Sequence, residues 1–449
     1  MLRPYSKVKQ FDLIIIGSGP GGYTTAALAA SLGANVAVVE RDNLGGTCLN
    51  RGCIPTKCLA ATAEAMLTAS RFAALGVDVA GVTLDYPRAC ARKDTVVASL
   101  REAVEGVLSG VTMIKGEARF TDAHTLEVGS ETLTAPKIIV ATGSRPATLP
   151  IPGAELAVDS DFMLAATELP SSAVIIGGGV IGLEFASILN ACGCGVTVLE
   201  YAPEILPGFD ADLSKRLRMS LKRRGVSIQT SAAVTAIADG GAGRTVSYTF
   251  KGKEKTAEAQ SVIMAVGRCP VLPPGLMELN PETERGFLKV DPLTMQTSIP
   301  GIYAVGDVNG LCMLAHAAEA QGRVALGLAS KLFTVPAAVF TVPECASVGM
   351  TEQQCAELQM DYKTGTAIYR SSGKALAMDE PDGMVKVIVG QRGKLLGCHI
   401  CGAHASDLIQ EMSVAIANGL TATDIVTTIH PHPTLSELLV SALHNALKG

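Results

Sequence analysis

The chain has 449 residues, of which 48% are hydrophobic, and a formal net charge of −5. At roughly 100–200 residues per domain, this length predicts about three domains with a substantial buried core. No stretch approaches the ~18 unbroken apolar residues of a membrane helix, and no basic stripe indicates binding to nucleic acid or to a membrane surface. The N-terminus lacks the apolar region of a signal peptide, and the twelve cysteines then indicate a reducing compartment. We therefore expect a cytoplasmic protein.

The first periodic unit is "FDLIIIGSGPGGYTTAALAASLGANVAVVE". Its pattern predicts a strand, a helix and a second strand, at Phe11–Ile16, Tyr23–Leu32 and Asn35–Val39. The first strand is followed by a G-x-G-x-x-G sequence, formed by Gly17, Gly19 and Gly22. The second strand ends at Glu40, which follows the last glycine by 18 residues.

The same pattern returns in "SSAVIIGGGVIGLEFASILNACGCGVTVLE". The predicted strand, helix and strand lie at Ala173–Ile176, Glu184–Ala191 and Val196–Leu199. The glycines are Gly177, Gly179 and Gly182. Glu200 again follows the last of them by 18 residues. This internal repeat predicts two Rossmann-like dinucleotide-binding domains.

Both copies have the context that a dinucleotide site requires, with a strand before the glycines, a helix after them and an acid further on. The glycines let the backbone approach a pyrophosphate at the helix N-terminus, and Glu40 and Glu200 are each expected to accept from a ribose hydroxyl. The Glu200 carboxylate repels a 2′-phosphate, and the following "YAPEILPG" contains no Arg or Lys, so the second site favours NAD over NADP. Glycine-rich packing without a ligand is the alternative for each copy.

Pro- and Gly-rich segments after two further strands mark the expected domain boundaries. Residues 1–148 and 269–335 are expected to form the first dinucleotide-binding domain, and residues 149–268 the second. From about Pro336 the pattern changes to antiparallel strands, with a turn at Gln391–Gly393, and then to helices. We therefore expect an α/β fold with a separate C-terminal α+β domain over residues 336–449.

Cys48 and Cys53 lie in "GGTCLNRGCIPTK", directly after the first β-α-β unit. Five residues of regular helix rise by about 7.5 Å, beyond the ~4.4–6.8 Å between the Cα atoms of a disulfide. Gly52 and Pro55 are expected to interrupt the helix between them and to bring the thiols within bridging range. A dithiol beside a nucleotide cofactor is a redox arrangement, whereas two buried structural cysteines are the alternative.

These segments resemble the flavin-dependent pyridine nucleotide–disulfide oxidoreductases over essentially the whole chain. The matching motifs are "GSGPGG", "GGTCLNRGCIPTK", "ATGSRP", "GGGVIGLEFA", "AVGR", "GIYAVGD", "FTVPECASVGMTE" and "HPHPTLSE". The resemblance implies FAD in the first site and NAD in the second. Within the family, the chain resembles the members that oxidise protein-bound dihydrolipoyl groups and reduce NAD⁺.

The resemblance also implies roles for single residues. Cys48 matches the thiol that exchanges with the substrate, and Cys53 matches the thiol that lies against the flavin. Lys57 matches a lysine near the flavin ring, and Glu184 an acid that pairs with it near the nicotinamide. Further cofactor contacts are implied at Thr142, Gly143, Asp307 and Ala315 for FAD, and at Gly267 for NAD. An Asp at the carboxyl end of a strand suits the polyol of a flavin chain, and a cap of the helix that follows is the alternative for Asp307.

The segment "HPHPTLSE" supplies the groups that move protons. By resemblance His432 is the acid/base and Glu437 orients it, with His430 in a supporting role and Pro433 expected to start the final helix. In the family this segment reaches the cysteines of the other subunit, which implies a homodimer. The implied partner is a lipoyl-bearing protein of a 2-oxo acid dehydrogenase or glycine cleavage complex.

Several points stay open in the sequence. Arg51 stands where an apolar residue is frequent in the family, and its charge either lowers the pKa of the thiols or is solvated. Cys398 and Cys401 lie three apart on a predicted strand, so they face opposite sides and are interpreted as packing. A glutathione reductase-like enzyme that consumes NADPH is the alternative function. A mercuric reductase lacks support because no paired cysteines end the chain, and a sensor subunit without turnover is expected to lack a reactive Cys, His or Glu.

Overall fold

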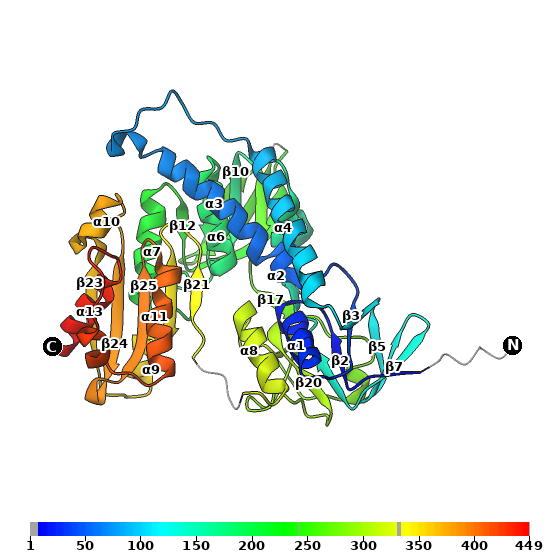
Figure 1. Ribbon diagram of the computed structural model, residues 1–449. Coiled ribbons are helices and arrows are strands. Elements are labelled where there is room, and N and C mark those ends of the chain that lie inside the picture. Colours follow the sequence, from blue (N-terminus) through cyan, green and yellow to red (C-terminus); the bar gives the residue numbers. More distant parts are fainter. Residues whose placement is uncertain (1–7, 242, 330–333, 449) are drawn as a thin grey trace. The chain divides into compact units, whose positions relative to one another are not determined.

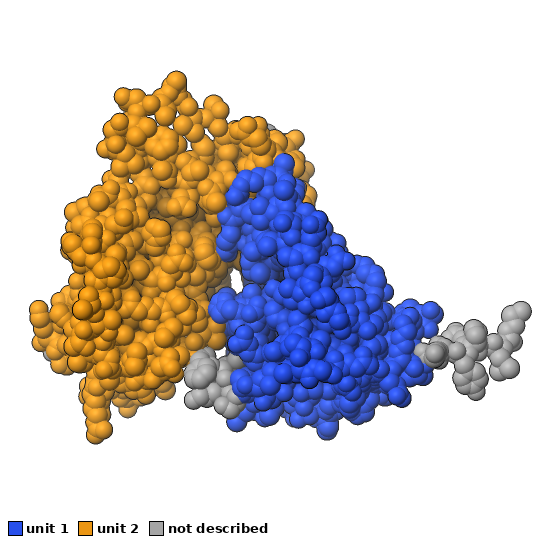
Figure 2. All heavy atoms as spheres, in the orientation of Figure 1, with its two compact units in different colours: residues 1–58, 90–147, 267–332 blue, residues 59–89, 148–266, 333–449 orange. Residues whose placement is uncertain are grey.

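The computed structural model describes residues 8–241, 243–329 and 334–448 (Figure 1). The chain divides into two compact units, which Figure 2 shows in different colours. The first unit contains residues 1–58, 90–147 and 267–332, and the second contains residues 59–89, 148–266 and 333–449. The expected assignment of four segments to domains stays a prediction. Among the described residues, no helix combines the length and the apolar character needed to cross a membrane.

A five-stranded parallel sheet with the order β20-β8-β2-β3-β4 lies in the first unit. Its strands are, in that order, Ile302–Ala304, Lys137–Val140, Leu13–Ile16, Val36–Glu40 and Thr112–Lys115. Every residue of β2 and β3 is buried, as expected for continuous apolar runs in a parallel sheet. Helices α1 (Pro20–Ser31) and α8 (Ala315–Ala325) meet closely, because a Cβ on Gly322 would lie 1.8 Å from Oγ1 of Thr25.

A second, four-stranded sheet in this unit has the order β1-β7-β6-β5. Its strands are, in that order, Lys9–Gln10, Glu131–Thr134, Thr125–Val128 and Ala118–Asp122. Phe120, Leu126 and Leu133 share a buried core with Ile14 and Ile138 of the parallel sheet. A short antiparallel ribbon of β9 (Ser144–Pro146) and β17 (Arg268–Pro270) joins two chain segments that are far apart in the sequence.

The second unit contains a four-stranded parallel sheet with the order β12-β11-β10-β16. Its strands are, in that order, Ser227–Gln229, Gly195–Leu199, Ser172–Ile176 and Ser261–Met264. Helix α6 (Val180–Ala191) connects β10 to β11, and α7 (Ala211–Arg223) precedes β12. An antiparallel sheet of β13 (Ala232–Asp239), β14 (Arg244–Phe250) and β15 (Lys253–Ala259) shares a core with the parallel sheet.

A five-stranded antiparallel sheet, β21-β22-β25-β24-β23, follows in the same unit. Its strands are, in that order, Ala337–Val339, Cys345–Gly349, Leu395–Cys401, Met384–Gly390 and Tyr362–Ile368. Helices α11 (Ala405–Ala417) and α13 (Glu437–Lys448) contribute to its core. The predicted turn at Gln391–Gly393 is confirmed as a short 3-10 helix between β24 and β25. Further helices are α4 (Tyr86–Val107), α5 (Ser160–Ala165), α9 (Glu352–Glu357), α10 (Gly373–Ala377) and α12 (Ala422–Thr427).

Three predicted helix starts are wrong by several residues. Helices α1 and α6 begin at Pro20 and Val180, earlier than predicted, because the glycine turn itself supplies the first hydrogen-bonded carbonyl. The N–H of Tyr23, for example, donates to the Gly19 carbonyl at 2.9 Å. The final helix begins later than predicted, at Glu437 rather than Pro433.

Cys398 and Cys401 both lie on β25 and are fully buried. Cys398 belongs to the hydrophobic core beside the helices, whereas Cys401 lies directly opposite Cys345 of β22 and shares a thiol hydrogen bond with it. The expectation that the two cysteines serve packing on opposite sides agrees with this arrangement.

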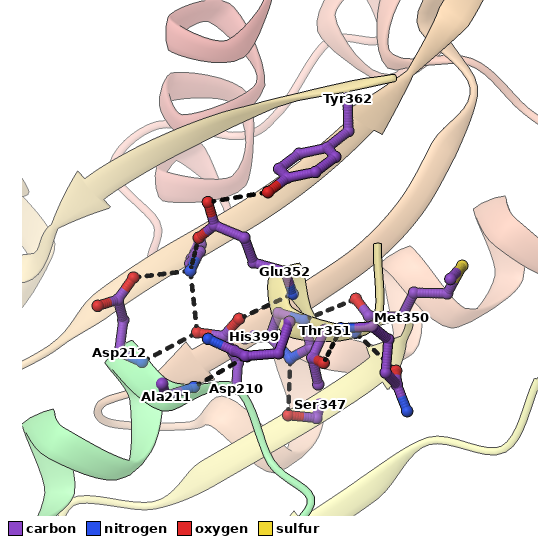
Figure 3. Close-up of polar contacts among 12 residues, drawn as sticks. Asp210, Ala211, Asp212, Ser347, Met350, Thr351, Glu352, Tyr362 and His399 are labelled. Carbon is purple, nitrogen blue, oxygen red and sulfur yellow. Dashed lines mark hydrogen bonds and ion pairs between the residues drawn. The ribbon is translucent and has the colours of Figure 1, made fainter. Parts of the chain in front are cut away.

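A buried ionic cluster around Lys386 links α7 to the antiparallel sheet inside the second unit (Figure 3). The Lys386 side chain is 2% exposed, and its Nζ lies 3.0 Å from Asp210, 2.7 Å from Asp212 and 2.5 Å from Glu352. Asp210 is fully buried and also accepts from the backbone N–H groups of Asp212 and Glu352. Beside it, His399 lies between Ser347 and the Met350 carbonyl, and burial lowers its pKa.

Candidate active site

The first G-x-G-x-x-G turn brings backbone segments too close for any side chain. Gly17 adopts φ +101°, and a Cβ there would lie 2.5 Å from the Ala141 carbonyl oxygen. A Cβ on Gly22 would lie 2.0 Å from the Gly17 carbonyl oxygen. The N-cap residue of α1, Gly19, has no side chain to cap the helix, so the positive end of the helix dipole is open to an anion. The turn therefore fits the pyrophosphate of a dinucleotide.

Glu40 is held at the end of β3 by three hydrogen bonds. One carboxylate oxygen accepts from the N–H and the hydroxyl of Ser18 at 2.8 and 2.7 Å, and the other accepts from the N–H of Asp42 at 2.7 Å. The side chain is thus fixed beside the glycine turn, where an acceptor for a ribose hydroxyl is needed. The contact of Ser18 with Glu40 was not predicted from the sequence. The position of Ser18, between Gly17 and Gly19, could have indicated it.

The second turn repeats this geometry in the other unit. Gly177 adopts φ +109°, and a Cβ there would lie 2.3 Å from the Ala265 carbonyl oxygen. A Cβ on Gly182 would lie 2.1 Å from the Gly177 carbonyl oxygen. Glu200 is 8% exposed, and its carboxylate accepts from the N–H groups of Gly178 and Ala202. This turn also fits a dinucleotide, again with no side-chain cap on its helix at Gly179.

The helix is interrupted between the two cysteines, as the sequence predicts. Cys48 lies in α2 (Gly46–Arg51), and α3 (Cys53–Ala69) begins at Cys53. Gly52 stands between them with φ −148° and ψ −112°, far from helical values. A Cβ there would lie 2.9 Å from the Thr47 carbonyl oxygen. Pro55 is the third residue of α3, where its missing N–H costs the helix nothing.

The start of the cysteine helix touches the first glycine turn. A Cβ on Gly46 would lie 2.6 Å from Cα of Gly19, and the N–H of Gly45 donates to the Ser18 carbonyl at 3.0 Å. Gly45 and Gly46 both have positive φ, of 92° and 59°. The structure therefore places the segment that carries Cys48 directly beside the first glycine turn.

Both cysteines are present as thiols, and they interact with each other. The hydrogen bond to Cys53 and burial raise the pKa of Cys48, whereas the positive charge of Lys57 acts in the opposite direction. Burial and the nearby groups Glu319 and Cys48 raise the pKa of Tyr23. The structure thus brings Cys48, Cys53 and Lys57 together, as expected. Tyr23 was missed, because its proximity to Cys48 arises only when α1 and α2 meet.

Arg51 forms an ion pair with Asp42. Both side chains are half-exposed, so the ion pair is in contact with solvent. Although burial opposes the change, the hydrogen bond and charge of Arg51 lower the pKa of Asp42. Its effect on the thiols stays an open prediction.

Asp307 belongs to a network with Ser144 and Arg268 in the first unit. It lies in a short 3-10 helix, Gly306–Asn309, and makes no capping hydrogen bond there, so the helix-cap alternative is wrong. Its carboxylate accepts from the Ser144 hydroxyl, and Nε of Arg268 donates to the same hydroxyl at 2.6 Å. Sequence reasoning missed both partners, although they adjoin the motifs "ATGSRP" and "AVGR".

The other implied cofactor residues lie at chain turns. Thr142 donates from its hydroxyl to the Val271 carbonyl, and Gly143 adopts φ +69° with open space at its Cβ position. Ala315 is the first residue of α8. Gly267 adopts φ +113°, also with open space at its Cβ position.

Glu184 is 5% exposed on α6, and its carboxylate accepts from the N–H of Phe340 at 2.9 Å. Glu184 belongs to the second unit and Lys57 to the first. Their pairing therefore stays a prediction.

His432 and Glu437 form a dyad in the second unit. Nδ1 of His432 lies 2.9 Å from one oxygen of Glu437, and the other oxygen accepts from the N–H of Thr434 at 2.9 Å. These two hydrogen bonds lower the pKa of Glu437. Because an ionised carboxylate only accepts, Nδ1 donates to Glu437, and in the neutral ring Nε2 keeps its lone pair. The His432 side chain is 80% exposed, so Nε2 is accessible to a substrate.

Comparison with known proteins identifies the family. Residues 11–322 match the family described as pyridine nucleotide-disulphide oxidoreductase, and residues 335–443 match its dimerisation domain. The chain belongs to the pyridine nucleotide-disulphide oxidoreductase family. It is a flavoprotein disulfide oxidoreductase whose cofactors are FAD and NAD(H), and the fold class inferred from the sequence is confirmed.

Individual relatives cover nearly the whole chain. It is 39% identical to the dihydrolipoyl dehydrogenase of Geobacillus stearothermophilus and 40% identical to that of Bacillus subtilis, over 97% of this chain and 96% of each relative. A solved structure, the HOCl-induced flavoprotein disulfide reductase RclA from Escherichia coli, superposes with a TM-score of 0.85 and 30% identity. That comparison covers 96% of this chain and 99% of the other.

Proposed function

We propose that the protein oxidises dihydrolipoyl groups on a carrier protein to lipoyl groups and reduces NAD⁺ to NADH. The observation that carries this proposal is the Cys48–Cys53 pair beside the first glycine turn, with Lys57 next to it. The names of the relatives at 39–40% identity support the substrate class. FAD, when bound in the first site, supplies two-electron transfer between the cysteine pair and the nicotinamide.

The protein's own groups carry out a thiol–disulfide exchange. Nε2 of His432 takes the proton of one substrate thiol, and the resulting thiolate attacks Cys48 of the oxidised pair. The bond between Cys48 and Cys53 breaks, and Cys53 leaves as a thiolate. The second substrate thiol then attacks the substrate sulfur bound to Cys48 and passes its proton to Cys48, which forms the lipoyl disulfide and releases Cys48 as a thiol. Two electrons and two protons have left the substrate, and the electrons reside on the two cysteine sulfurs.

Two charged groups support this exchange. Glu437 keeps the proton on Nδ1 of His432, so that Nε2 stays available as the base. Lys57 favours the thiolate of Cys48 through its positive charge.

Glu200 supports NAD rather than NADP as the electron acceptor. Its carboxylate is fixed by two backbone N–H groups at the end of β11, where a 2′-phosphate would meet a negative charge. A glutathione reductase-like enzyme that consumes NADPH is therefore not favoured.

We also propose that the protein is a cytoplasmic homodimer. The dimerisation-domain match and the exposed His432 support the dimer, in which His432 would serve the cysteines of the other subunit. Residues 1–148 and 269–335 would bind FAD, residues 149–268 would bind NAD, and residues 336–449 would form the interface. A lipoyl-bearing protein of a 2-oxo acid dehydrogenase or glycine cleavage complex would be the partner.

The deciding experiment compares two substrate pairs on the purified holoenzyme. We expect turnover with NADH and lipoamide and little with NADPH and glutathione; activity only with the second pair would refute the proposal. A Cys48→Ser variant should keep its FAD and lose lipoamide turnover. Full lipoamide activity in that variant would exclude the disulfide mechanism.

A further inference from the structure

His430 faces hydrogen-bond acceptors on both sides of its ring. Nδ1 lies 2.9 Å from the Thr428 carbonyl oxygen, and Nε2 lies 2.9 Å from a carboxylate oxygen of Glu411. A carbonyl oxygen and an ionised carboxylate can only accept, so each ring nitrogen must donate. A neutral imidazole has one N–H, and the geometry therefore requires the doubly protonated form.

The neighbouring His432 is placed differently. Its Nδ1 has an acceptor, Glu437, but its ring is 80% exposed, whereas the His430 side chain is 10% exposed. His430 thus has little water to replace either partner. The two histidines, two residues apart, are a fixed cation and an available base.

We propose that His430 is a resident imidazolium and a positioning residue, which holds the catalytic loop in place by tying it to helix α11 through Glu411. The catalytic loop is residues 428–436, between α12 and α13, and it carries His432. This inference rests on the proposed function, because it assigns His432 the role of base.

The anchor of this tie is rigid. Helix α11 buries Ile409, Met412 and Ala415 in the core of the antiparallel sheet, so Glu411 is carried by a fixed element. The loop itself is anchored in the same core at its C-terminal end, where Leu435 is buried. Thr434 bonds the Pro431 carbonyl and Glu437, and these are contacts within the loop and the start of α13. His430 therefore supplies the tie at the N-terminal end of the loop.

The charges around His430 favour its protonated form. Glu411 on α11 and Glu437 on α13 both face it, and these carboxylates and the Thr428 carbonyl raise the pKa of His430 although burial opposes them. A raised pKa means that the tie is complete below the ordinary histidine value of about 6.5 and is lost as the pH rises through the folded value. Above that value the ring keeps only one N–H, so a lone pair faces either the Glu411 carboxylate or the Thr428 carbonyl, and the tie is weakened.

The protonation state can be read without turnover. In holoenzyme with isotope-labelled histidine, the resonances that disappear in His430→Phe identify His430 among the seven histidines. We expect His430 to titrate above the ordinary value of about 6.5 and to return toward it in Glu411→Gln, whose amide can both accept and donate. A neutral His430 at pH 7 in the unaltered protein would overturn the inference.

Kinetics test the positioning role. His430→Phe should lower kcat for dihydrolipoamide oxidation by about tenfold, because a displaced base is a poorer proton acceptor. NADH oxidation by ferricyanide, which needs no thiol proton, and the FAD content should not change. His430→Lys, which restores a cation facing Glu411, should recover part of the rate. His444→Phe, at an exposed position of α13, is the matched control.

Equal kcat values for His430→Phe and His444→Phe would refute the positioning role. A fully active His432→Gln variant would instead refute the proposed function, and the resonance measurement on His430 would still stand. The two failures are therefore distinguishable.

Discussion

Replacing Lys386 by Met tests the ionic cluster of Figure 3. The substitution removes the one ammonium that faces Asp210, Asp212 and Glu352, at a position 2% exposed to solvent. The Asp212 and Glu352 side chains are 58% and 35% exposed, so water can solvate them and each loss is worth at most about 1 kcal/mol. Asp210 is fully buried and is left as an unpaired charge.

The magnitude follows from Asp210. Breaking a buried ion pair from one side typically costs about 3–5 kcal/mol. Asp210 keeps two backbone N–H donors, from Asp212 and Glu352, so we expect the lower end, about 3 kcal/mol. For a domain of 150–250 residues this corresponds to roughly 6–12 °C in Tm.

The assay is the apparent Tm of the holoenzyme at one protein concentration and one scan rate. Lys363→Met, at an exposed position of β23, is the matched control and should change Tm little. The double variant Asp210→Asn/Lys386→Met should recover about 2 kcal/mol, because an Asn can keep the backbone contacts without a charge.

The loss should not depend on pH near neutrality. The carboxylates that surround Lys386 raise its pKa although burial opposes them, so its contribution is complete below the unfolded value of about 10.4. The pKa of Asp210 is lowered, so its contribution is lost only as the pH falls below its unfolded value of about 3.9. A Lys386→Met variant that melts with the Lys363→Met control, or a double variant with strictly additive losses, would contradict this reasoning.

Two further substitutions test the sites. Gly22→Ala should lose FAD, because its Cβ would lie 2.0 Å from the Gly17 carbonyl oxygen. Gly106→Ala, whose Cβ would meet open space, is the control and should keep FAD. Equal flavin absorbance in the two purified variants would show that the turn tolerates a side chain. Glu437→Gln should lower kcat for dihydrolipoamide oxidation by about 10²-fold, because the His432 ring loses its anionic partner. Hydrogen bonds from Thr434 and His432 lower the pKa of Glu437, so its support of His432 is present above the ordinary Glu value and is lost only as the pH falls through that lowered value. An unchanged kcat in Glu437→Gln at pH 7 would contradict the orienting role.

Features that depend on neighbouring residues could be predicted from the sequence. Both glycine turns require close backbone contact within a few residues, and both were predicted together with Glu40 and Glu200. The helix break at Gly52 was also predictable, because Gly and Pro act on the local backbone. The turn between β24 and β25 belongs to the same class of local features.

Contacts between groups that are distant in the sequence became apparent only in the folded chain. Lys386 contacts Asp210 across 176 positions of sequence, and Arg268 reaches Ser144 across 124. Neither pair has a local pattern, because burial of a charge is compensated by whichever element packs against it. The same holds for His430. No local pattern distinguishes it from His432, and the difference arises from Glu411, which α11 carries to the ring of His430 and not to that of His432.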